Sequence, residues 1–122
     1  MDSKIQKLVL YAQRTEIIEH FIYYELAKRT KNEGNAEVLR RIGDQEKNHY
    51  NFWKLKSGID IAPDKKRIWR TVLLAKLLGL SFVLKQMEKR ERTGSKLYNE
   101  LSVYFPETKC FSEEELEHEK KC

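Results

Sequence analysis

The sequence has few of the residues that build small disulfide-linked, metal-ribbon or β-rich domains. Its 122 residues include two cysteines, Cys110 and Cys122, which lie twelve positions apart and outside any Cys-x-x-Cys motif. This pattern excludes a zinc ribbon, a rubredoxin-type iron centre and a disulfide framework, and it favours a reducing compartment. Five glycines and two prolines are too few for the turns of a sandwich or barrel. Long helices are favoured instead.

The chain also lacks a long apolar run and a clear excess of one charge. The most apolar stretch, residues 68–84, contains Arg70 and Lys76 and is shorter than a membrane span. No apolar core of a secretion signal occurs in the first seven residues. Twenty-four Lys and Arg are interspersed with nineteen Asp and Glu, without a clean basic stripe. We expect a soluble, cytoplasmic protein with no nucleic-acid partner and no membrane span.

Apolar residues recur at three- and four-residue steps in four segments, which predicts an all-α bundle. The expected helices cover residues 2–31, 36–57, 67–104 and 106–122. The fourth is short for a bundle helix. Either residues 1–122 are a fragment of a longer protein, or another subunit covers the exposed core.

Glycine and proline set the expected helix boundaries. Gly34-Asn35 is expected to end the first helix and Gly58 the second. Gly79 is expected to bend the third segment or to divide it into a crossover piece and a main helix. Pro63 marks residues 59–66 as a connection.

Each expected helix carries a charged residue where its apolar stripe should continue. These residues are Glu19, Glu46 with His49, Glu88 with Glu91, and Glu115 with His118. Twenty-seven residues separate Glu19 from Glu46 and again Glu88 from Glu115, and sixty-nine separate the two histidines. The chain therefore reads as two helical hairpins that repeat one Glu…Glu-x-x-His pattern.

Taken singly, these residues have ordinary explanations. Residues 112–115, Ser-Glu-Glu-Glu, fit a capping box. Glu88 and Glu91 lie among lysines and arginines and fit surface ion pairs. His20 lies on the side of the helix away from Glu19 and is expected at the surface. The repeated spacing favours a shared site, because independent surface charges have no reason to keep one register.

A cluster of buried carboxylates repels itself unless cations compensate it. Two divalent ions supply about four positive charges, and carboxylate-plus-imidazole ligation suits iron or manganese. One Glu from each of two helices and a Glu-x-x-His from each of the other two form the ligand set of di-iron bundles. The sequence therefore predicts two iron ions, with manganese or zinc as substitutes in the purified protein.

The motifs resemble the rubrerythrin branch of the ferritin-like superfamily over most of the chain, and the extra carboxylate of Glu91 is typical of rubrerythrins. The resemblance implies a ferritin-like four-helix bundle with a crossover connection between helices 2 and 3. It implies that the fixed metal ligands are Glu19, Glu46, Glu88, Glu115 and His118. It also implies that Glu46 and Glu115 bridge the ions, and that His49 and Glu91 exchange at one ion as it oxidises.

Shorter phrases resemble a narrower group. Thr15-Glu16-Ile17-Ile18-Glu19 and Leu78-Gly79-Leu80-Ser81-Phe82 are similar to the ferritin-like domain that precedes membrane iron transporters of the vacuolar iron transporter type. This resemblance implies that the chain is such a domain without its membrane part.

The implied function is a rubrerythrin-like peroxidase or ferroxidase, in which a carboxylate-bridged di-iron site oxidises Fe(II) with peroxide or dioxygen. Because the cysteines of a rubredoxin-like domain are absent, an external protein must donate electrons. A homodimer is the expected assembly, and hairpin exchange through residues 59–66 is one way of forming it. The alternatives are a non-catalytic iron-sensing or iron-delivery domain coupled to a membrane iron transporter, and a metal-free bundle with charged helix faces.

Glu91 generates a prediction about the oxidant. It lies one turn beyond Glu88 and competes with His49 for one metal, and exchanging a neutral imidazole for a carboxylate stabilises ferric iron. Peroxide is therefore expected to oxidise the ferrous site faster than dioxygen does. Glu91→Ala should retain most ferrous binding and slow peroxide oxidation at least about tenfold in anaerobic stopped-flow absorbance. Faster oxidation by dioxygen, or an unaffected variant, would contradict this expectation.

Overall fold

The computed structural model describes residues 2–108, apart from the side chains of residues 91–95, 98 and 108. Within these residues the chain is helical and has no strand, which confirms the all-α class. The helices are α1 (Ser3–Lys28), α2 (Glu33–Ser57), α3 (Lys65–Leu78), α4 (Leu80–Leu101) and the 3-10 helix η1 (Pro106–Thr108). Of the expected fourth helix, only η1 lies within the described part of the chain.

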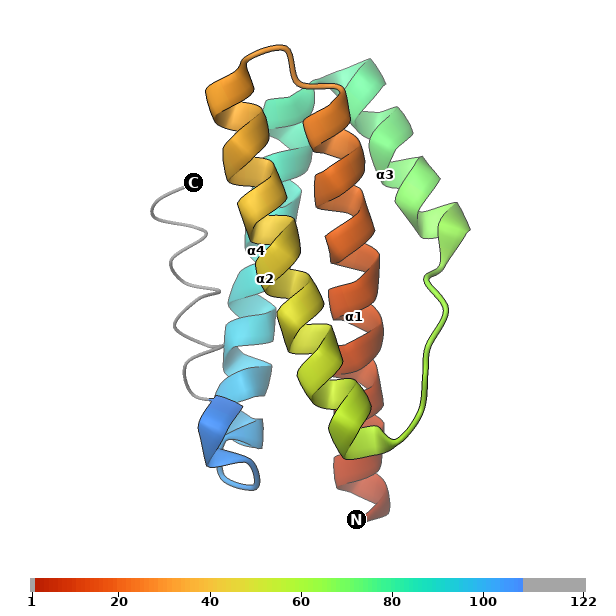
Figure 1. Cartoon of the computed structure of the whole chain (residues 1–122), viewed down its shortest axis with the longest axis vertical. Coiled ribbons are helices and arrows are strands. Elements are labelled where there is room, and N and C mark those ends of the chain that lie inside the picture. The colour runs from red at the N-terminus through yellow and green to blue at the C-terminus, as the bar shows by residue number, and fades with distance from the viewer. Residues whose placement is uncertain (1, 109–122) are drawn as a thin grey trace.

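A long return connection separates α2 from α4 (Figure 1). α1 and α2 form an antiparallel hairpin. Residues 58–64 and then α3 bring the chain back along α1 to the end where α2 began, so α4 runs in the same direction as α2. α3 therefore lies at the edge of the bundle beside α1, and α4 packs with the hairpin.

The two glycine stops after α2 and α3 are confirmed. Gly58 and Gly79 cap these helices with positive φ values of 71° and 99°, a region that favours glycine. Gly79 therefore divides the expected third segment into α3 and α4. α3 begins at Lys65, two residues earlier than expected, because the Asp64 side chain accepts the N–H groups of Lys66 and Arg67.

The expected stop at Gly34-Asn35 is wrong. α1 already ends at Lys28, and both residues lie in the first turn of α2. The cause is an N-cap that begins α2 early. The Asn32 side chain accepts the N–H of Asn35 at 2.9 Å, and a glycine in the first turn does little to oppose helix formation.

Two apolar clusters form the core. The first joins α1, α2, α3 and α4 through residues such as Ile18, Ile22, Leu26, Leu39, Ile42, Ile68, Val83 and Met87. The second lies toward the other end of the hairpin and consists of Val9, Ala12, Trp53 and Leu101. Trp53 is completely buried in this second cluster.

α1 and α2 approach closely at Gly43. His20 Nδ1–H donates to the Gly43 carbonyl at 2.8 Å, and a Cβ at Gly43 would lie 2.7 Å from the Tyr24 ring. The Tyr24 hydroxyl donates to Asp44, which holds the ring in place. The expectation that His20 is a surface residue is therefore wrong. It is half-buried, because the missing side chain at Gly43 lets the helices approach.

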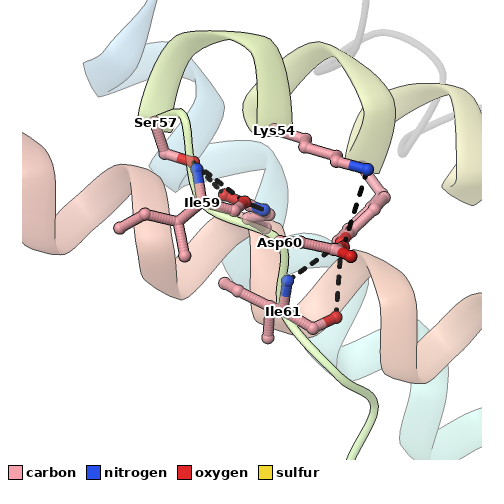
Figure 2. A network of polar contacts seen from close by, with 7 residues as sticks. Lys54, Ser57, Ile59, Asp60 and Ile61 are labelled. Carbon is pink, nitrogen blue, oxygen red and sulfur yellow. Dashed lines mark hydrogen bonds and ion pairs between the residues drawn. The ribbon is translucent and has the colours of Figure 1, made fainter.

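The start of the connection after α2 is held against the hairpin (Figure 2). Gln13 Nε2 donates to the Ile59 carbonyl at 2.6 Å, and Ser57 Oγ donates to Gln13 Oε1 at 2.7 Å. The Tyr50 hydroxyl donates to Asp60, and this hydrogen bond lowers the pKa of the Asp60 carboxyl. Residues 59–66, through which hairpin exchange is expected, thus begin with contacts to α1 and α2 of the same chain.

Gly43→Ala tests the close helix approach. Alanine favours a helix by about 1 kcal/mol over glycine, but here the added methyl meets the Tyr24 ring. Overpacking costs about 1–3 kcal/mol. We therefore expect urea unfolding, followed by circular dichroism, to show a net loss of stability. Asn48→Ala, at an exposed position of α2, is the control and should be neutral or stabilising. Equal behaviour of the two variants would show that the contact does not constrain the helices.

Candidate metal centre

A polar layer separates the two apolar clusters of the hairpin. Its members are Gln13, Glu16 and Glu19 from α1, and Glu46 and His49 from α2. None of the five is more than 3% exposed. The three-residue spacing from Glu16 to Glu19, and from Glu46 to His49, keeps each pair on the inner face of its helix. Ionisable groups are thus buried between layers of hydrocarbon.

Glu16, Glu46 and His49 form the tightest group in this layer. One potential ligand atom from each residue lies within 4.8 Å of the other two. Three atoms bound to one metal at about 2.0–2.2 Å lie roughly 3–4.4 Å from one another. The three side chains are therefore close enough for small side-chain rotations to bring them onto one cation. Two carboxylates and an imidazole are a donor set that suits iron, manganese or zinc.

Glu16 and His49 also contact each other directly. His49 Nδ1 lies 3.2 Å from Glu16 Oε2, and both side chains are almost completely buried. An ionised Glu16 carboxylate accepts this hydrogen bond, and His49 Nδ1–H donates it. A metal ion bound through His49 Nε2 leaves the hydrogen bond in place, whereas an ion bound through Nδ1 displaces its proton.

Arg90 of α4 supplies a positive charge near Glu19. Burial lowers the pKa of the Arg90 guanidinium, as do the charges of Arg67 and Arg70, whereas the Glu19 carboxylate raises it. Arg90 Nη1 is buried and makes no hydrogen bond within the described residues. Part of the negative charge of the layer is therefore offset by a guanidinium, which the sequence analysis did not anticipate.

The structure brings only some of the expected ligands together. Glu19, Glu46 and His49 are buried in the polar layer, and Glu88 is half-buried on α4. The compact group of described residues includes Glu46 and His49 but neither Glu19 nor Glu88. Glu91 belongs to α4, but its side chain lies outside the described residues, as do Glu115 and His118.

Glu16 is the site residue that the sequence analysis missed. The available signal was its spacing, because Glu16 precedes Glu19 by three positions just as Glu46 precedes His49. Both glutamates lie on the apolar face of α1. The twenty-seven-residue register favoured Glu19, whereas the rotation of α1 against α2 brings Glu16 to the histidine.

Fold and site together define an all-α protein with a buried carboxylate–histidine group that has the composition of a metal site. Searches of protein-family models, of curated protein sequences and of solved structures gave no match to the chain. Among the described residues, no helix combines the length and the apolar character needed to cross a membrane.

From the group of Glu16, Glu46 and His49 we predict that a bound metal stabilises the fold and that Glu16 is one of its ligands. Anaerobic ferrous iron at about one hundred times its dissociation constant should add roughly 2.7 kcal/mol, raising the melting temperature by about 10 °C. Glu16→Gln should lose most of this increase because a neutral amide replaces a charged ligand. Glu25→Gln, which alters an ion-paired glutamate elsewhere on α1, is the control. A full increase in Glu16→Gln would remove Glu16 from the ligand set.

Proposed function

We propose that the protein is a non-haem iron protein that oxidises Fe(II) with peroxide or dioxygen at a carboxylate–histidine centre. The observation that carries the proposal is the buried group of Glu16, Glu46 and His49, whose ligand atoms lie within 4.8 Å of one another. Three glutamates in one dry layer need positive charge, and the Arg90 guanidinium near Glu19 supplies part of it. A divalent cation at Glu16, Glu46 and His49 would supply more.

In this proposal the protein's own residues bind the ion, orient its ligands and exclude water from the site. Glu16, Glu46 and His49 would hold one ion, and the apolar clusters on either side would keep solvent from it. When no ion is bound, the His49 Nδ1–H donates a hydrogen bond to the Glu16 carboxylate. This hydrogen bond keeps the imidazole oriented toward the site. Bound iron would supply the electrons that reduce the oxidant.

The second half of the centre is proposed from the sequence pattern. Its ligands would be drawn from the remaining glutamates and the last histidine, namely Glu19, Glu88, Glu91, Glu115 and His118. The expected roles of Glu46 and Glu115 as bridges, and of His49 and Glu91 as exchanging ligands, belong to this proposal. So do an external electron-donor protein and a homodimer.

The proposal predicts about two ferrous ions per complete site. Protein freed of metal with a chelator is titrated anaerobically with ferrous iron, and bound metal is measured after desalting. Glu46→Gln should bind at least about tenfold more weakly, because it removes a buried charged ligand. Glu37→Gln removes an exposed glutamate of the same helix and should match the wild type. Addition of peroxide or dioxygen to loaded protein should then convert ferrous to ferric iron.

Two results would contradict the proposal in different ways. Absence of saturable iron binding would leave a metal-free bundle in which Arg90 and protons balance the carboxylates. Tight binding without oxidation by either oxidant would favour the iron-sensing or iron-delivery alternative.

A further inference from the structure

The whole formal net charge of the chain resides in one helix. α3 contains three lysines and two arginines and no acidic residue. The chain has twenty-four Lys and Arg and nineteen Asp and Glu, for a net charge of +5. Outside α3 the basic and acidic residues are therefore equal in number, nineteen of each. The net positive charge of the chain therefore equals the charge of α3.

The exposed residues of α3 are of only two kinds. Four are basic and four are large and apolar: Lys65, Lys66, Arg70 and Lys76, and Trp69, Leu73, Leu77 and Leu78. Each of the four apolar side chains is at least half exposed. Trp69, Leu73 and Leu77 follow one another at four-residue spacing, so they form one stripe along the helix. We call these eight residues the α3 outer face.

A hollow adjoins this face. It has a volume of about 500 Å³ and lies where α3 meets the end of α1 and the start of α4. Leu26, Val72 and Leu80 provide apolar lining, and Arg29, Lys31 and Lys76 provide basic groups. Arg29 also lies over the Trp69 ring, 5.6 Å from its centroid, so the hollow and the stripe form one continuous surface.

We propose that the α3 outer face docks on an anionic lipid bilayer, with α3 lying in the interface. Large apolar side chains can enter the acyl boundary while the long lysine and arginine side chains beside them reach the headgroups, and Trp is favoured at that depth. Lys and Arg near the surface are attracted to anionic headgroups. In the hollow, the basic groups would contact a lipid headgroup and the apolar lining would contact the start of its acyl chain.

Charge and composition disfavour the other occupants. A second copy of α3 would bring five more positive charges against the first five without an acidic partner on either helix. A nucleic acid would satisfy the basic groups but would leave Leu73, Leu77 and Leu78 against a polar backbone. A bilayer satisfies both halves of the surface.

Vesicle binding by the full chain tests the proposal. Phosphatidylcholine vesicles with about 30% phosphatidylserine should bind the protein at least about tenfold more strongly than phosphatidylcholine alone, and about 0.5 M salt should weaken binding. Brominated lipid should quench Trp69, since Trp53 is fully buried. Trp69→Phe should abolish the quenching. Leu73→Glu/Leu77→Glu should weaken vesicle binding at least about tenfold, and Lys66→Gln/Arg70→Gln should weaken it specifically on anionic vesicles.

Leu55→Glu is the matched control, because Leu55 is an exposed leucine of α2. It should bind vesicles as the wild type does, and circular dichroism should show all variants equally helical. Equal binding to neutral and anionic vesicles, or none to either, would overturn the proposal. So would dimerisation that Leu73→Glu/Leu77→Glu abolishes without vesicle binding, or duplex DNA binding that the same variant retains. None of these measurements requires bound metal.

Discussion

The burial of three carboxylates and an imidazole in one layer of the α1–α2 hairpin constrains the rest of the fold. An uncompensated carboxylate in a protein interior costs several kcal/mol, and here apolar clusters on both sides keep water away. The layer is stable only if its charges are paired closely. The contact between His49 and Glu16 and the guanidinium of Arg90 near Glu19 supply part of this pairing. The geometry of the hairpin therefore has to be held accurately.

Much of this arrangement follows from the sequence. Apolar periodicity and the interrupting glutamates lead to Glu46 and His49, and positive-φ glycines end α2 and α3 where expected. The start of α2 was misplaced because the Asn32 side chain, rather than the nearby glycine, sets that boundary. Glu16 was missed for a different reason. Which of two glutamates on one helical face meets a partner depends on the rotation of α1 about its axis.

That rotation is fixed by contacts whose effect cannot be read from spacing. At Gly43 the backbone of α2 accepts a hydrogen bond from His20, and the Tyr24 ring packs where a Cβ would otherwise lie. A glycine in a helix ordinarily lowers stability, so from sequence alone Gly43 reads as a weakness. In the fold it is a point of close approach. It lets α1 and α2 approach closely at His20, one turn beyond the contact between Glu16 and His49.

The concentration of basic residues in α3 is not apparent from the charge balance of the whole chain. Basic and acidic residues alternate over most of the chain, and the balance outside α3 is even. Only the helix boundaries and the burial of Ile68 and Val72 show that the basic residues of α3 share their solvent side with Trp69, Leu73 and Leu77. α1 lies between this face and α2, and no residue belongs to both the polar layer and the α3 outer face. The first apolar cluster connects them, because Ile68 of α3 packs in it with Ile18 and Ile22 of α1. Docking through solvent-facing side chains would leave that cluster intact, so the proposed metal centre and the proposed docking surface are compatible.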